Sequence, residues 1–206
     1  LSQALINTDP HEIQQSMRET HPTSMSSVPR FWEKVYQAVK DKIDRSNPMQ
    51  QKLFRHALEI GRKYNLECKS RCKRPSPMLA MEYKVFDKMV LRLVRKQLGL
   101  ENANIFPTAG AAVSPEVERF AHSVGLNMVA GYGLTESLAT VSCDRENMPY
   151  TIGSVGRPIN GLDVKIGDND EILLKGPTIT HGYYRRDAAN KEAFTEDGYF
   201  RTGDAG

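Results

Sequence analysis

The stretch Leu126-Asn127-Met128-Val129-Ala130-Gly131-Tyr132-Gly133-Leu134-Thr135-Glu136 joins a short apolar run to a glycine-containing loop. Residues 126–130 predict a buried strand, because a short apolar run bounded by turn-forming residues is typical of one. Ligands of open α/β sheets bind beyond the carboxyl ends of the strands. Residues 131–136 therefore stand where a ligand site is expected.

The elements just upstream of this stretch indicate a parallel layer. Asn104-Ile105-Phe106 predicts another strand, and a loop of small residues from Thr108 to Ala112 follows it. Ser114-Pro115-Glu116 provides an N-cap residue, a first-turn proline and an acidic first turn, so it predicts a helix that ends near Gly125. The order strand, loop, helix, strand favours two parallel strands joined by a helix.

Three amphipathic helices are predicted further upstream. The first spans Trp32 to Ile43, and the second includes Leu53 to Leu58 beyond a break at Asn47-Pro48. The third runs from Phe86 to Leu98 and has Gly99 at its C-terminal cap. Between the second and third helices we predict a solvated loop, which carries the densest basic run of the chain: Arg62, Lys63, Lys69, Arg71, Lys73 and Arg74.

The pattern changes beyond Tyr150. Alternating apolar residues in 162–166, a turn at 167–170 and the apolar run 171–175 predict an antiparallel hairpin, followed by a short helix from about Asp187 to Phe194. We place a subdomain boundary near 145–155. The predicted fold class is α/β: part of a parallel-sheet α/β subdomain (1–150), followed by part of a small antiparallel β subdomain (151–206).

Composition narrows the function classes. The 206 residues are 39% apolar, enough for one domain, or for one domain and part of another. No apolar run approaches the roughly 20 residues that span a bilayer, and residues 1–10 lack the basic start and apolar core of a signal peptide. The three cysteines, Cys68, Cys72 and Cys143, favour a reducing compartment, and Cys68 and Cys72 lack the second ligand pair of a metal site.

The net charge of +3 is divided unevenly along the chain. Residues 1–99 carry 19 Lys and Arg against 10 Asp and Glu, whereas residues 100–206 carry 9 against 15. The basic run at 62–74 can attract nucleic acid, anionic lipid or phosphorylated ligands, or can simply be solvated. Because no nucleic-acid motif accompanies it, we expect no nucleic-acid partner. Contact with a membrane surface stays open.

The loop after the predicted strand at 126–130 holds residues suited to nucleotide chemistry. Its glycines, Gly131 and Gly133, let the backbone approach a ligand closely, and Tyr132 can stack on a flat ring. Thr135 offers a hydroxyl to a phosphate, and Glu136 offers a hard oxygen to Mg²⁺. Taken singly, Glu136 also fits a surface charge and Tyr132 a packed ring.

Two other segments carry weaker signals. The small residues of 108–115 expose backbone groups against which a planar ligand can lie, although a tight turn between strand and helix explains them equally well. In Tyr199-Phe200-Arg201-Thr202-Gly203-Asp204, Asp204 can accept hydrogen bonds from a ribose diol. By itself, Thr-Gly-Asp is only a turn.

In this order and at these spacings, the segments resemble the adenylate-forming (AMP-binding) superfamily, which includes acyl-CoA synthetases, luciferases and adenylation domains of peptide synthetases. The resemblance covers roughly residues 20–206. It rests on Tyr132–Glu136, Gly153–Pro158, Glu171–Pro177 and Tyr199–Asp204. The segment Val28-Pro29-Arg30-Phe31-Trp32-Glu33-Lys34-Val35-Tyr36 resembles the long-chain fatty-acyl-CoA synthetases in particular.

The resemblance implies a role for each matching position. Thr135, at the α-phosphate, and Glu136, on Mg²⁺, would be the catalytic residues. The remaining positions would bind the nucleotide. Gly110, Ala111 and Ala112 would form a wall beside the adenine, while Gly131 would contact the adenine edge and Tyr132 would stack on the ring. Asp204 would bind the ribose hydroxyls, and Gly133 would also belong to the nucleotide site. Asp170 stands where glycine is usual in the family, so the turn before Glu171 is expected to differ in shape.

The resemblance also implies a reaction. A carboxylic acid, most like a long-chain fatty acid, would be activated by ATP with Mg²⁺ to an acyl-adenylate and passed to coenzyme A as co-substrate, a step of lipid metabolism. The partners would be small molecules and the location cytoplasmic, with membrane association an open alternative. Adenylation of a shorter acid or an amino acid, or a non-catalytic nucleotide-binding scaffold, are the competing hypotheses. Oligomeric state is not predicted.

Two parts of the family pattern are missing from the sequence. These are the phosphate loop with its lysine, normally upstream, and the C-terminal domain that supplies a second lysine. The chain also begins with Leu1. We therefore expect an internal piece of a longer enzyme that is inactive alone.

Overall fold

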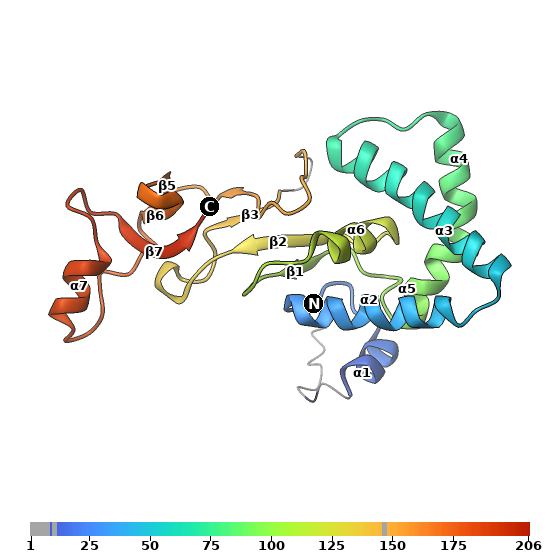
Figure 1. Ribbon diagram of the computed structural model, residues 1–206, viewed down its shortest axis with the longest axis horizontal. Coiled ribbons are helices and arrows are strands. Elements are labelled where there is room, and N and C mark those ends of the chain that lie inside the picture. Colours follow the sequence, from blue (N-terminus) through green and yellow to red (C-terminus); the bar gives the residue numbers. More distant parts are fainter. Residues whose placement is uncertain (1–8, 10–11, 146–147) are drawn as a thin grey trace. The chain divides into compact units, whose positions relative to one another are not determined.

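The computed structural model describes residues 9, 12–145 and 148–206 (Figure 1). The described chain divides into two compact units. The first includes the residues up to Ala130 together with Arg145–Ser154, and the second consists of Gly131–Asp144 and Val155–Gly206. Whether these units are the subdomains expected from the sequence stays a prediction. The expectation for residues 1–10 lies outside the described residues, apart from Asp9.

Most of the first unit is helical. Prolines begin four of its helices at the first helical turn, where a missing N–H costs nothing. Asn47 and Ser76 each cap a helix, by accepting hydrogen bonds from the backbone N–H groups of Gln50 and Leu79. The α-helices are α1 (Ile13–Thr20), α2 (Pro29–Asp44), α3 (Pro48–Arg62), α4 (Pro77–Phe86), α5 (Arg92–Leu98) and α6 (Pro115–Ser123).

Two stretches of π-helix extend these helices. η3 (Asp87–Leu91) joins α4 to α5 without a break, and η1 (Lys63–Cys68) continues α3 into the 3₁₀ turn η2 (Lys69–Arg71). The predicted helix at 86–98 is confirmed, with its start moved to α4, and Gly99 caps it in the left-handed conformation at φ 74°.

The predicted loop in the basic run is wrong for residues 63–71, which are helical, and is confirmed for residues 72–76, which include Lys73 and Arg74. The sequence has no proline or glycine between Arg62 and Pro75, so nothing breaks the backbone pattern of α3 there. Arg62 also bridges Glu59 and Glu67, at 2.8 and 2.6 Å, and so offsets part of the charge repulsion along the run. High charge density indicated solvation correctly but did not indicate a loop.

The predicted parallel pair is confirmed, with each strand two residues later than expected and with β2 continuing into the second unit. β1 (Phe106–Thr108) pairs in parallel with β2 (Met128–Tyr132), with Thr108 opposite Ala130, and α6 connects the two strands. Trp32 of α2 is fully buried, packs edge-on against Phe106 and donates a hydrogen bond from its ring N–H to Thr108 Oγ1 at 2.9 Å. This contact fixes α2 against the end of β1.

Helix α3 approaches α6 closely at Gly61. A Cβ atom at that position would lie 2.0 Å from the Ser123 carbonyl oxygen, so only glycine allows this approach. The buried core of the unit is formed by apolar side chains from its helices and strands: Met17, Trp32, Phe54, Ala57, Leu91, Leu98, Leu100, Phe106, Val117, Phe120, Ala121, Val124, Leu126 and Met128.

A buried carboxylate attaches the segment Arg145–Ser154 to α6. Glu118 is only 1% exposed; its carboxylate accepts hydrogen bonds from the Tyr150 hydroxyl and, at 2.7 Å, from the Gly153 N–H. The Tyr150 ring also lies against the buried His122 ring, at 4.6 Å between centroids. Burial lowers the pKa of His122 to about 4, so the ring packs as a neutral group at ordinary pH.

The second unit is built from short strands. The end of β2 pairs antiparallel with β3 (Ser142–Cys143), which pairs with β4 (Arg157–Pro158). A separate antiparallel sheet has the order β5 (Asp163–Ile166), β6 (Glu171–Lys175), β7 (Phe200–Ala205). The unit also contains the 3₁₀ turns η4 (Thr135–Ser137) and η5 (Asp168–Asp170) and the helix α7 (Asp187–Ala193).

The hairpin and the α/β fold class are confirmed. Val164 lies opposite Leu174 in the β5–β6 pair, and the turn between the strands places both Asn169 (φ 57°) and Asp170 (φ 60°) in the left-handed region. Asn and Asp tolerate that region better than most side chains, which explains how the turn forms without the expected glycine. Among the described residues, no helix is both long and apolar enough to cross a bilayer.

Replacing Glu118 by Gln should lower the free energy of unfolding by about 1–3 kcal/mol. A Gln side chain has one acceptor oxygen in place of two, so either the Tyr150 hydroxyl or the Gly153 N–H loses its buried acceptor. Chemical denaturation of the full-length protein measures the change. Glu116→Gln is the matched control on the same helix, because Glu116 is exposed and a Gln oxygen still accepts from Tyr36. Equal losses in the two variants would contradict the assignment.

Candidate functional site

The loop after β2 folds tightly on itself. Gly133 has no room for a side chain, since a Cβ there would lie 1.3 Å from the Ala139 carbonyl oxygen. Ser137 closes the turn by exchanging 3.0 Å hydrogen bonds with the N–H and carbonyl of Leu134. Leu138 and Ala139 adopt left-handed conformations, at φ 53° and 82°. The close approach predicted for this glycine is therefore found against the chain's own backbone, and its role toward a ligand stays a prediction.

Tyr132 and Asp204 are brought together within the second unit. The Tyr132 hydroxyl donates a 2.7 Å hydrogen bond to Asp204 Oδ2, which links β2 to β7. Partial burial and this hydrogen bond raise the pKa of Tyr132 to about 12, so the phenol stays a donor at physiological pH. The two predicted nucleotide-binding side chains thus share one hydrogen bond, and Asp204 is exposed to solvent.

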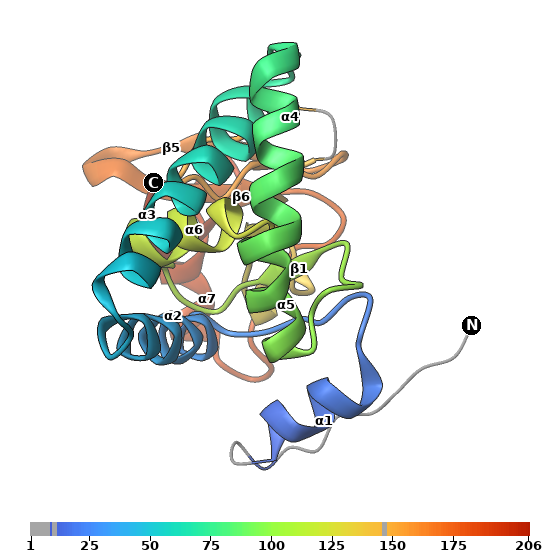
Figure 2. The same cartoon turned by 90° about the vertical axis from the view of Figure 1, so that its right-hand side faces the viewer.

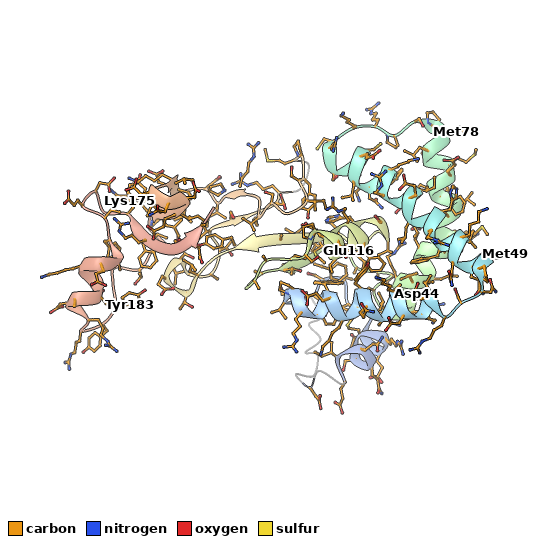
Figure 3. The ribbon with its side chains drawn as sticks, in the orientation of Figure 1. Asp44, Met49, Met78, Glu116, Lys175 and Tyr183 are labelled. Carbon is orange, nitrogen blue, oxygen red and sulfur yellow. The ribbon has the colours of Figure 1, made fainter. Side chains whose placement is uncertain are left out.

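Thr135 and Glu136 line an open cleft of about 400 Å³ in the second unit. Glu136 is half-buried there, and its Oε1 accepts a 2.9 Å hydrogen bond from the hydroxyl of Tyr183, which Figure 3 labels. Its backbone carbonyl accepts a 2.7 Å bond from the N–H of Thr180. The hydrogen bond to Glu136 raises the pKa of Tyr183, which keeps that hydroxyl protonated. The first bond restrains one oxygen of the carboxylate, and the second fixes the backbone of Glu136 against residues 177–183.

The opposite lining of this cleft was missed by sequence reasoning. Residues 177–183, which follow β6, contribute Thr178, Thr180, His181 and Tyr183. The Thr178 hydroxyl is buried and has no hydrogen-bond partner among the described residues. A usable signal was present in the sequence, because hydroxyl and imidazole side chains gather directly after a predicted strand, where loops carry functional groups.

The small-residue loop belongs to the first unit. It begins at Ala109, directly after β1, and Gly110, Ala111 and Ala112 are all exposed. Gly110 has φ +93° and no atom within 4 Å of a Cβ built there, so backbone conformation and not crowding calls for glycine. The other predicted site residues, from Gly131 to Asp204, lie in the second unit.

The cleft fits a magnesium ion held jointly with phosphate. Among the described residues, hydrogen bonds engage the carboxylate of Glu136 at Oε1 alone, which leaves Oε2 available to a cation. Mg²⁺ prefers hard oxygen ligands and usually binds through one or two carboxylates plus substrate phosphates. No group of three or more His, Cys, Asp or Glu side chains suited to a metal occurs in the described part of the chain, so an all-protein cage is not the arrangement that fits.

A sequence model of the family described as AMP-binding enzyme matches residues 2–184. The chain is similar to the long-chain-fatty-acid–CoA ligase FadD15 of Mycobacterium bovis, with 34% identity over 187 residues, 90% of this chain and 30% of that protein. It is also similar to the long-chain-fatty-acid–CoA ligase ACSBG1 of Rattus norvegicus, with 30% identity over 211 residues, 100% of this chain and 27% of that protein.

Solved structures share the fold. A Bacillus subtilis o-succinylbenzoate CoA synthetase (MenE) bound to a product analogue aligns with a TM-score of 0.56 and 16% identity over 94% of this chain and 30% of that one. A malonyl-CoA ligase with methylmalonyl-CoA and AMP bound aligns with a TM-score of 0.53 and 20% identity over 93% and 33%. The chain spans about 30% of the length of the curated relatives it matches.

Gly133→Ala should destabilise the protein by about 2–3 kcal/mol, since the Ala139 carbonyl and the turn around it must move. Gly131→Ala is the matched control two residues away. Its Cβ would meet the Ser142 carbonyl oxygen at 3.3 Å, a contact that small shifts relieve, so a loss of about 1 kcal/mol or less is expected. Thermal and chemical unfolding of the two variants measure the difference. A Gly133→Ala protein as stable as Gly131→Ala would show that the turn is not closed as described.

Proposed function

Because the chain belongs to the AMP-binding enzyme family, we propose that the protein carrying it uses ATP to activate a carboxylic acid as an acyl-adenylate. A carboxylate oxygen of the acid attacks the α-phosphorus of ATP, and pyrophosphate leaves. The thiol of coenzyme A then attacks the acyl carbon, so that a thioester forms and AMP leaves. The supporting observation is the oriented Glu136 carboxylate, with one oxygen available, in a cleft lined by hydroxyl groups.

In this proposal the cleft residues position the phosphates. Thr135 donates its hydroxyl to an α-phosphate oxygen. Glu136 would hold Mg²⁺, which would supply positive charge to offset the charge that develops on the phosphates. Tyr183 keeps the Glu136 carboxylate in place from the other side of the cleft. The protein performs little covalent chemistry, and positioning of this kind contributes about 7–11 kcal/mol in well-oriented systems.

We propose that the adenine base and the ribose of ATP bind to residues near Thr135 and Glu136 in the sequence and to Asp204. Tyr132 stacks on the adenine, Gly131 contacts its edge, and Asp204 accepts hydrogen bonds from the ribose hydroxyls. Gly110, Ala111 and Ala112 provide a wall beside the adenine. In the described state Asp204 accepts a hydrogen bond from Tyr132, so a ribose would add to or replace that donor.

We propose a long-chain fatty acid as the substrate. Both curated relatives described above are long-chain-fatty-acid–CoA ligases by name, and together they cover the whole chain. The segment Val28–Tyr36, which resembles the same branch, forms the start of α2 against the end of β1.

Substrate-dependent ATP–pyrophosphate exchange by the full-length protein tests the proposal, with acids from acetate to palmitate and several amino acids. Exchange should be stimulated most by the long-chain acids. Glu136→Gln should reduce it at least about tenfold, because the neutral amide retains the Tyr183 hydrogen bond but loses the charge that binds the metal.

Glu192→Gln on α7 is the control, since Glu192 is exposed and lies outside the cleft lining. The exchange rate of this variant should stay within about twofold of that of the unmodified protein. An unchanged exchange rate in the Glu136→Gln protein would contradict the assignment of Glu136 as a Mg²⁺ ligand. A folded protein that shows no ATP–pyrophosphate exchange with any acid would favour the hypothesis of a non-catalytic scaffold. Exchange stimulated most by amino acids would show that the substrate is an amino acid and not a fatty acid.

A further inference from the structure

A row of exposed apolar side chains runs along the helix formed by α4, η3 and α5. Figure 2 shows this helix as one long rod beside α3. Successive members of the row are three or four residues apart, so they share one side of the rod. Their exposed fractions lie between 48% and 68%, high values for apolar side chains in helices: Met78, Met81, Val85, Met89 and Leu93.

A second row, which is basic, lies directly beside the first. Lys84, Lys88 and Arg92 are exposed and immediately precede Val85, Met89 and Leu93, and Lys96 extends the row by one turn. None of Lys84, Lys88 and Arg92 forms an ion pair within the described residues. The acidic side chains of the same rod, Glu82 and Asp87, are half-buried, and Asp87 is bonded to Arg95 at 2.8 Å.

The π-helical segment η3 helps to keep these rows straight. In a regular α-helix, residues four apart are displaced by about 40° around the axis, so a row at this spacing winds off one face. A π-turn contains more residues, so the displacement across it has the opposite sign. Met89 lies inside η3 and Leu93 lies beyond it, and both side chains are exposed. This exposure agrees with a row that stays on one face of the rod.

The apolar row borders further apolar surface on α3. Leu53 is exposed and lines, together with Met89 and Leu93, an open groove of about 390 Å³. Met49 at the start of α3 is 81% exposed; Figure 3 labels it with Met78 at the start of α4, and the two methionines mark opposite ends of the helix pair. The end of α3 leads into the exposed basic residues Lys69, Arg71, Lys73 and Arg74.

We propose that this face, composed of the apolar row Met78, Met81, Val85, Met89 and Leu93 and the basic row Lys84, Lys88, Arg92 and Lys96, docks on the surface of an anionic phospholipid bilayer. We call it the Met–Lys face. An amphipathic helix with a cationic edge lies in the plane of the interface, with its apolar side chains among the upper acyl chains and its basic side chains at the headgroups.

Charge complementarity favours a membrane over a protein partner. Lysine is depleted in the cores of protein–protein interfaces, because its ammonium group must be desolvated there. At a bilayer, the same side chains extend toward the headgroups while their stems cover apolar surface. Anionic lipid attracts each lysine near the surface, and the basic residues 69–74 add to that attraction.

Vesicle flotation with the full-length protein tests this inference, with vesicles of phosphatidylcholine alone and of phosphatidylcholine mixed with phosphatidylglycerol. Binding should require the anionic lipid and should fall steeply between about 0.05 M and 0.5 M NaCl. Lys88→Gln should weaken binding about fivefold. Lys34→Gln removes the same charge from an exposed position on α2 and should change binding by less than about twofold.

The apolar row is tested separately. Met81→Gln combined with Met89→Gln should weaken binding about tenfold, since both side chains leave the acyl region, while glutamine preserves helix propensity. Met148→Gln, at an exposed methionine outside the face, is the control and should leave binding unchanged. The melting temperature should stay unchanged in every variant, because all these positions are exposed.

Three outcomes would overturn the inference. The first is a full-length protein that does not float with anionic vesicles. The second is equal loss of binding in Lys88→Gln and Lys34→Gln, or undiminished binding in the double methionine variant. The third is a clear fall in melting temperature, or a change in oligomeric state, in the double methionine variant, because the face would then be covered by the rest of the protein or by a second copy.

Discussion

The buried carboxylate of Glu118 anchors the segment of the chain that returns to the first unit. The backbone leaves the first unit after Ala130, returns for Arg145–Ser154 and leaves again. The Tyr150 hydroxyl and the Gly153 N–H of the returning segment donate to Glu118 on α6. The Tyr150 N–H also donates to the Ser70 carbonyl at 2.7 Å, and the Tyr150 ring packs on His122. A carboxylate with so little exposure is costly to bury unless its lone pairs are bonded.

Periodic patterns predicted the regular elements well, whereas contacts between distant residues were beyond them. Apolar spacing and caps identified α2, α6 and the β5–β6 hairpin, because these depend on neighbouring residues. The helical form of 63–71 was missed because charge was taken as a sign of a loop. The lining of the cleft by 177–183 depends on the backbone contact between Thr180 and Glu136, which nothing local encodes. The glycine at 133 was noticed, but its closest neighbour, Ala139, was not foreseeable.

The helical structure of residues 63–71 changes how the basic charge of the first half of the chain is interpreted. As a loop, the run at 62–74 would have been a flexible patch of charge with no apolar neighbour. As a continuation of α3, it leads toward the start of α4, where the apolar row begins at Met78. The combination of charge with exposed apolar surface on one rod is what distinguishes an interfacial helix from an ordinary solvated one.

The cleft illustrates how a single tyrosine can restrain a carboxylate. A carboxylate free on both oxygens rotates, and fixing it on binding has an entropic cost. The Tyr183 hydroxyl donates to one oxygen of Glu136 and so restrains the carboxylate, while the Thr180 N–H fixes the backbone of the same residue. Because the raised pKa keeps Tyr183 protonated, it remains a donor across the physiological range. In the function proposed above, the second oxygen of Glu136 would be left for Mg²⁺ while the first stays bonded to Tyr183.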